Sequence, residues 1–171
     1  GLRFVLLMAA WDGYRIPGGF RRILPKRHAD YRGENALFRE MVGAFVPPRW
    51  ATLVIVGGDA AYGSQANMGM VQARDKADTA RRWGFVFAIA RTWKTVEEKT
   101  IKNLVTHVPQ TYDQRTRVPR EQVRHSRKTF WTFHTRLCLR HIGEVTVILS
   151  KRGRNLGPKQ TKILVTNLAE L

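Results

Sequence analysis

Two continuous apolar segments with a helical pattern between them constrain the fold more than any other feature of the chain. Residues 52–56 read TLVIV and residues 84–90 read GFVFAIA, and neither alternates with polar residues. Such runs are typical of strands buried on both faces, so we expect 52–56 to be a central strand. Ser64 is a suitable N-cap for a helix running to about Arg82, with Gly84 beyond its end. The strand–helix–strand order predicts an α/β fold.

A predicted hairpin and a further helix precede this unit. Residues 3–11 (RFVLLMAAW) read as a buried strand, and the Asp-Gly pair after them is a strong turn signal. Residues 14–26 read as the returning strand, interrupted by a Pro-Gly-Gly sequence. Residues 35–45 place apolar residues at helical spacing, with Asn35 as the expected N-cap and a Pro-Pro pair after the helix. We therefore expect hairpin, helix, strand, helix and strand in chain order.

The balance of charge indicates a polyanionic partner. The chain of 171 residues has 30 Lys and Arg against 13 Asp and Glu, a formal net charge of +17. This favours nucleic acid, with a membrane surface as the weaker alternative. No apolar run reaches the roughly 18–20 residues that span a bilayer, so no membrane partner is expected. Cys138 is the only cysteine, which excludes an internal disulfide and fits a reducing, cytoplasmic compartment.

The composition of the sequence changes after Arg91. Residues 113–162 are basic and strand-like, with thirteen Lys and Arg against three acids, or +10 of the total +17. A buried strand is then expected within the sequence TKILVTNL. We therefore predict a core at 1–90, a β-rich basic insertion at 91–160, and a return strand to the core at 161–171.

One strand of the predicted insertion, FWTFHTRLCLRH, separates its residues by face. Period-two alternation places Trp131, Phe133, Leu137 and Leu139 on one side, and Thr132, His134, Arg136, Cys138 and Arg140 on the other. The second face is either simply solvated or contacts phosphates together with the nearby loop KRGRNLGPK. A zinc site fails on geometry. The rise of a strand puts His134 and Cys138 about 13 Å apart, and His141 points the other way.

Asp59 follows the predicted strand 52–56 and has three interpretations. It can be a structural turn residue at the end of the strand. A dinucleotide site is a weak alternative, because Gly57, Gly58 and Gly63 do not have the G-x-G-x-x-G spacing, and the absence of a G-x-x-x-x-G-K-[ST] sequence excludes a P-loop. The third interpretation is a metal ligand, since open α/β sheets bind ligands beyond the carboxyl ends of their strands and Mg²⁺ takes carboxylate oxygens.

Several segments together resemble one family of enzymes. The segments VIVGGDAAYGSQANMGMVQ and GFVFAIARTWKT are similar to the second-aspartate region of DDE transposases of bacterial insertion sequences, in the insertion-sequence-four-like group. The segments DGYRIPGGFRRILPKRHADYRGENALFREMV and TFWTFHTRLCLRHIGEVTVILSKRGRNLGPKQTKILVTNL extend the resemblance over nearly the whole chain. The resemblance implies a ribonuclease-H-like core, interrupted by a β-rich insertion and incomplete here.

The resemblance also implies a site of three carboxylates, of which this chain matches one. Asp59 matches the second aspartate of the family. In the family, the first aspartate is on a strand that precedes the hairpin in the sequence. In the sheet, that strand lies between the hairpin and the strand that ends at Asp59. Asp12 lies in the hairpin turn and is interpreted as structural. Glu170 lacks the family's Tyr-Arg-Glu-Lys pattern. We therefore expect an inactive internal fragment of a longer transposase.

The implied function is metal-dependent cleavage and transfer of DNA strands during transposition. Two Mg²⁺ or Mn²⁺ ions would lie in the complete site, with Asp59 as both a catalytic residue and a metal ligand. The expected partner is double-stranded DNA, both transposon ends and target, in the bacterial cytoplasm at the nucleoid. The resemblance leaves room for a dimeric parent. The alternative is a non-catalytic basic nucleic-acid-binding module or a degenerate transposon remnant. An RNA-binding protein has little support, because no interleaved aromatic platform is evident.

The expected DNA-binding residues lie in and around the insertion. They are Arg91, Trp93, Lys94, Arg127, Lys128, Arg152, Arg154 and Lys159. Trp93 has two interpretations: it packs the insertion onto the core, or it stacks on an unpaired base near the cleavage point.

Overall fold

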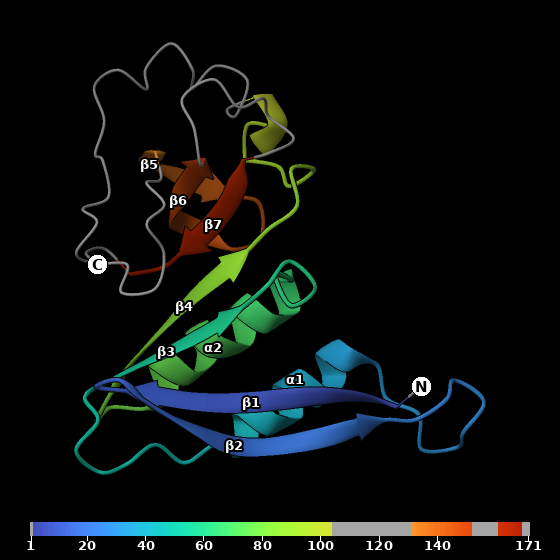
Figure 1. Cartoon of the computed structure of the whole chain (residues 1–171). Helices are drawn as coiled ribbons and strands as arrows, with labels where there is room; N and C mark the ends of the chain where they lie inside the picture. Colours follow the sequence, from blue (N-terminus) through green and yellow to red (C-terminus); the bar gives the residue numbers. More distant parts are fainter. Residues whose placement is uncertain (1, 104–130, 152–160, 169–171) are drawn as a thin grey trace.

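The computed structural model describes residues 2–103, 131–151 and 161–168, which form a hairpin, two helices and a five-stranded sheet (Figure 1). The side chains at 131–133 and 151 lie outside this description. The elements are β1 (Arg3–Trp11), β2 (Tyr14–Ile23), α1 (Glu34–Ala44), β3 (Leu53–Gly58), α2 (Gln65–Ala77), β4 (Arg82–Ala88), β5 (Trp131–Leu139), β6 (Gly143–Lys151) and β7 (Lys162–Thr166).

Strands β1 and β2 form the predicted antiparallel hairpin. Asp12 and Gly13 have φ values of +46° and +82°, the left-handed conformation that tight hairpin turns require. The register shifts between Leu7 and Met8, where Gly18 is an extra residue on β2. The Pro-Gly-Gly sequence therefore makes a bulge within a continuous strand, rather than a break in it.

Helix α1 begins at Glu34, two residues before the start that an N-cap at Asn35 would give. Its N-cap is Gly33, without a side-chain hydrogen bond, so the prediction of Asn35 as N-cap is wrong. Asn35 lies in the first turn, and its side chain binds the carbonyl oxygen of Ala61 instead. The helix buries its apolar stripe of Leu37, Phe38, Met41 and Val42.

Helix α2 begins as predicted but ends early. Ser64 is the N-cap, and its Oγ accepts a hydrogen bond from the backbone N–H three residues on, at 3.3 Å. The helix ends at Ala77 and does not reach Arg82. The reason is Asp78, whose carboxylate accepts bonds from the N–H two residues on and from the indole of Trp83, at 3.1 and 2.8 Å. These bonds stabilise a turn in place of another helical turn.

The main sheet is mixed, with the order β3-β4-β7-β6-β5. Strands β3 and β4 are parallel, and the remaining neighbours are antiparallel. The β5–β6 hairpin of the predicted insertion joins the sheet of β3 and β4 through β7. Gly84 lies inside β4, not after a helix as expected. A Cβ there would come within 2.4 Å of Leu168 Cδ2, so only glycine lets this side chain cross the strand. The predicted α/β class is confirmed.

Strand β3 differs from the expected central strand. In the described part of the chain it pairs only with β4 and forms the edge of the sheet. Leu53 and Ile55 are each 47% exposed, while β1, which pairs only with β2, leaves Leu6 58% and Met8 45% exposed. The expectation that β3 is buried on both faces is therefore wrong for this structure. In the described part of the chain, β1 and β3 each have one unpaired edge, and both strands leave apolar side chains exposed to solvent.

Candidate functional site

Asp59 is the first residue after β3 and is exposed. Its Oδ1 accepts a hydrogen bond from the N–H of Ala61 at 2.9 Å, and its carbonyl oxygen accepts bonds from the N–H groups of Tyr62 and Gly63, both at 3.1 Å. This is the structural turn role that the sequence allowed. The bond from Ala61 uses one of the two carboxylate oxygens, so this solvent-facing group can still accept a ligand.

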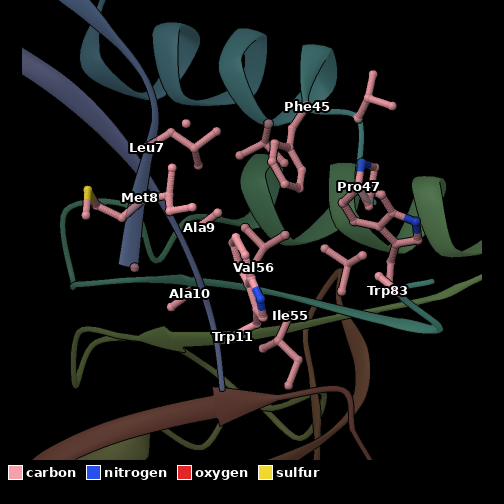
Figure 2. Close-up of a pocket in the computed structure, with 18 of the residues that line it drawn as sticks. Leu7, Met8, Ala9, Ala10, Trp11, Phe45, Pro47, Ile55, Val56 and Trp83 are labelled. Atoms are coloured by element: carbon pink, nitrogen blue, oxygen red, sulfur yellow. The ribbon is translucent and has the colours of Figure 1, made fainter. Parts of the chain in front are cut away.

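A groove of about 610 Å³ runs between β1 and β3, and Asp59 lies among the residues that line it. Figure 2 shows that its walls are apolar, with Leu7 and Trp11 from β1, Phe45 from the segment after α1, and Ile55 from β3. Backbone groups on the facing edges of β1 and β3 pair with no strand that the structure describes. The groove therefore combines apolar walls with two open hydrogen-bonding edges.

The two strands beside the groove run in opposite directions (Figure 1). At one end, the ring of Trp11 at the end of β1 lies 5.9 Å from the ring of Trp50, just before β3. At the other end, Arg3 at the start of β1 forms an ion pair with Glu34 in α1, whose first turn contacts the loop after β3. Asp59 thus lies at the end of the groove where β1 begins.

Tyr62 marks the same end of the groove. Its ring stacks on Phe38 with centroids 5.0 Å apart. The pKa of its phenol is raised, first because burial disfavours the anion and then because of the negative charges of Glu34 and Asp59. The carboxylates of Glu34 and Asp59 are therefore both close enough to Tyr62 to affect the pKa of its phenol.

The carboxylate of Asp59 fits one ligand position of a metal site but does not complete a site. Across residues 2–103, 131–151 and 161–168, no group of three or more His, Cys, Asp or Glu side chains could hold a metal ion. Stable binding of a hard divalent cation needs further oxygen ligands. A metal centre at Asp59 would therefore depend on groups beyond those described.

The residues after β4 leave the sheet at the same edge as Asp59. Strands β3 and β4 are parallel and Gly58 pairs with Phe87, so both chains leave the sheet side by side. Arg91 lies three residues beyond β4 and is half-buried. Lys94 is exposed, and its Nζ binds Glu98 Oε2 at 2.7 Å. The structure thus places the end of β4 beside the end of β3, without a described contact between Arg91 and Asp59, while Lys94 already has an acidic partner.

Trp93 is half-buried and packs against the buried core. Its carbonyl oxygen accepts a hydrogen bond from the N–H of Ile101 at 2.9 Å. These contacts favour the packing interpretation over the stacking one.

We expect Trp93→Ala to lower the free energy of unfolding by about 2 kcal/mol, roughly half the cost of removing a fully buried aromatic side chain. Denaturant melts of a longer, folded parent chain would measure it, with Trp93→Phe as the conservative control. Hairpin or single-stranded DNA ends should still quench tryptophan fluorescence in the alanine variant. Loss of that quenching in a fully folded variant would favour base stacking instead.

The remaining predicted DNA-binding residues lie outside the described part of the chain. They are Arg127, Lys128, Arg152, Arg154 and Lys159. The alternation predicted for the neighbouring strand holds where side chains are described, because His134, Arg136 and Cys138 are exposed and Leu139 is buried. The exposed face of β5 is therefore polar and partly basic.

Sequence reasoning missed three polar residues that contact the loop after Asp59, directly or through one another. They are Asn35 and Arg39 of α1 and Asn67 of α2. Asn67 is fully buried on the apolar side of its helix. The sequence signal for this network is Asn67, an amide at a position where the helical pattern expects a core residue. A buried polar group needs hydrogen-bond partners, so such an amide indicates that a polar network surrounds it.

No helix in the described part of the chain has the length and apolar character to cross a bilayer. A scan against protein-family models and a search of curated proteins found no match to this chain.

Proposed function

We propose that this chain is part of a DNA transposase whose ribonuclease-H-like core cleaves and transfers DNA strands. Asp59 would be one of its catalytic carboxylates, and double-stranded DNA, as transposon ends and target, would be its partner in the bacterial cytoplasm. The observation that carries the proposal is the position of Asp59, at the carboxyl end of β3 and at one end of the groove between β1 and β3.

We infer that the groove between β1 and β3 could hold one additional strand. Because β1 and β3 run in opposite directions, one inserted strand could lie antiparallel to β1 and parallel to β3 at the same time (Figure 1). Its carboxyl end would then lie beside Asp59. The result would join the hairpin, the new strand, β3 and β4 into one sheet, which is the strand order of a ribonuclease-H-like core.

The sequence pattern of β3 supports the same arrangement. Its continuous apolar run is typical of a strand with both faces covered, yet Leu53 and Ile55 are each 47% exposed. A natural edge strand is usually protected by charges, prolines or bulges. The segment LVIVGG of β3 has no charge and no proline. Its composition therefore fits a strand with neighbours on both sides.

The basic residues and the carboxylate of Asp59 would have separate roles. The excess of Lys and Arg would attract the DNA polyanion, and Asp59 would offer an oxygen at the point of reaction. Divalent metal ions held by such carboxylates supply an activated water or 3′-hydroxyl and stabilise the leaving oxygen. Since the described residues provide one position of that site, the other carboxylates would lie outside the described residues.

A second candidate is a non-catalytic basic nucleic-acid-binding module. It is favoured by the excess of Lys and Arg over Asp and Glu, 30 against 13, which attracts a polyanion whether or not the chain cleaves it. The two candidates differ in one measurable reaction. A longer reading frame that supplies the strand and the glutamate helix should nick its own terminal DNA in the presence of Mg²⁺ or Mn²⁺. Metal-independent binding without any nicking would favour the binding module.

Neutralising the predicted basic surface should weaken DNA binding in a salt-dependent way. We expect replacement of Arg127, Lys128, Arg152, Arg154 and Lys159 by glutamine to reduce the slope of log K against log salt by about 0.9 for each phosphate that the variant no longer neutralises. Arg32→Gln with Arg82→Gln is the control, because both residues are exposed and already form ion pairs with Glu40 and Asp75. Fluorescence anisotropy with duplex DNA at several salt concentrations measures the slope. An unchanged slope in the fivefold variant would place the DNA-binding surface elsewhere.

A further inference from the structure

A fully buried amide connects the loop after Asp59 to both helices. Asn67 of α2 donates from Nδ2 to the carbonyl oxygen of Tyr62 at 2.8 Å and to Asn35 Oδ1 at 2.6 Å. Its Oδ1 accepts from Arg39 Nη1 at 3.0 Å. Both heavy atoms of the amide thus have partners, as a completely buried polar group requires.

Asn35 extends this network to the residue that contacts the carboxylate. Its Nδ2 donates to the carbonyl oxygen of Ala61 at 3.1 Å. The N–H of Ala61 donates to Asp59 Oδ1 at 2.9 Å. Ala61 is therefore held on one side by α1 and on the other by the carboxylate, so the position of α1 determines where that carboxylate oxygen lies.

Close packing holds the same loop against the sheet. A Cβ on Gly63 would lie 1.9 Å from the carbonyl oxygen of Ala88, at the end of β4. A Cβ on Gly58 would lie 2.9 Å from both the ring of Phe87 and the Cβ of Tyr62. Glycine at these positions lets the loop contact β4 directly. The hydrogen-bond network and this packing restrain the loop from opposite sides.

We propose that Asn35 and Asn67 are positioning residues that hold the Asp59 carboxylate in the orientation its ligand needs; this inference rests on the proposed function. Neither residue reaches the reacting atoms by a described contact, and both act through the backbone at 61–62. Supporting residues of this kind orient metal-binding groups, and their loss costs roughly 10–100-fold in metal affinity or activity.

The test uses a longer, cleaving parent chain with Asn35→Ala. We expect the Mg²⁺ concentration for half-maximal cleavage to rise by about 10–100-fold, with the rate at saturating Mg²⁺ largely recovered. Hydrogen exchange at the backbone amides of 61–63 should accelerate. Gln72→Ala is the matched control: Gln72 Nε2 also donates to a backbone carbonyl, that of Ile142 at 3.1 Å, but makes no described contact with the loop.

Three outcomes would overturn the proposal. The first is an unchanged Mg²⁺ midpoint together with unchanged amide exchange at 61–63. The second is an equal loss of rate at all Mg²⁺ concentrations with a lowered melting temperature, which indicates a merely structural role. The third is the same shift in the Gln72→Ala control.

Two further arrangements keep the inference testable. If Asn35→Ala fails to fold, Asn35→Asp retains an acceptor for Asn67, removes the donor to Ala61 and adds a negative charge. If the unmodified parent does not cleave DNA, the proposed function fails on its own. Amide exchange in the variants then still decides whether these residues hold the loop: faster exchange at 61–63 supports that role, and unchanged exchange overturns it.

Discussion

Replacing Asp59 by asparagine is expected to abolish DNA cleavage by a longer parent chain while leaving DNA binding nearly unchanged. Asparagine retains an Oδ1 that can accept the bond from the N–H of Ala61, so the turn after β3 should persist. The substitution removes the negative charge, and a neutral amide oxygen is a poor ligand for a hard divalent cation. The loss should exceed the roughly 10–100-fold effect of a supporting residue. Single-turnover cleavage assays and anisotropy would measure the two effects separately.

Two companion variants make this test specific. Asp12→Asn makes the same chemical change in the hairpin turn, where the φ of +46° suits asparagine, and should cleave normally. Asp59→Cys should regain activity with a softer, thiophilic cation such as Mn²⁺ more than with Mg²⁺. Cleavage by Asp59→Asn within tenfold of the unmodified protein would contradict the catalytic assignment.

Supplying one apolar strand for the groove is expected to change the stability of the whole protein. Leu6, Met8, Leu53 and Ile55 are exposed along its two edges. Full burial of such a side chain contributes about 1.5–3 kcal/mol, and an entire domain is stable by only about 5–15 kcal/mol. We therefore expect this chain alone to be poorly soluble or partly folded, because open apolar edges promote aggregation. A chain extended by the upstream strand should unfold cooperatively.

Calorimetry and analytical ultracentrifugation would test this expectation directly. The control is the same extension with a proline at the centre of the added strand, which removes a donor needed for pairing with β1 or β3. This variant should behave like the unextended chain. A sharp two-state transition of the unextended chain, monomeric at micromolar concentration, would show that the sheet is stable without an added strand.

Local signals in the sequence identified most of the elements. The Asp-Gly turn, the Ser64 cap and the apolar runs of β1, β3, β4 and β7 depend only on neighbouring residues, and the structure confirms the turn, the cap and the four strands. The predicted burial of β1 and β3 is wrong, because both strands leave apolar side chains exposed. The end of α2 was mispredicted because Asp78 binds Trp83, a contact across a turn that helical periodicity does not register. The N-cap at Asn35 was mispredicted because its amide binds a residue 26 positions away.

By itself, the sequence determined the α/β class, the positive charge and the place of Asp59 at the end of an apolar strand. Only the tertiary structure decided that β3 lies at an edge, that β1 runs opposite to it across an apolar groove, and that α1 and α2 hold the loop after Asp59. The physical reason is the separation along the chain of the residues that interact. Strand and cap preferences depend on adjacent residues, whereas sheet order and buried amide networks depend on residues that only folding brings together.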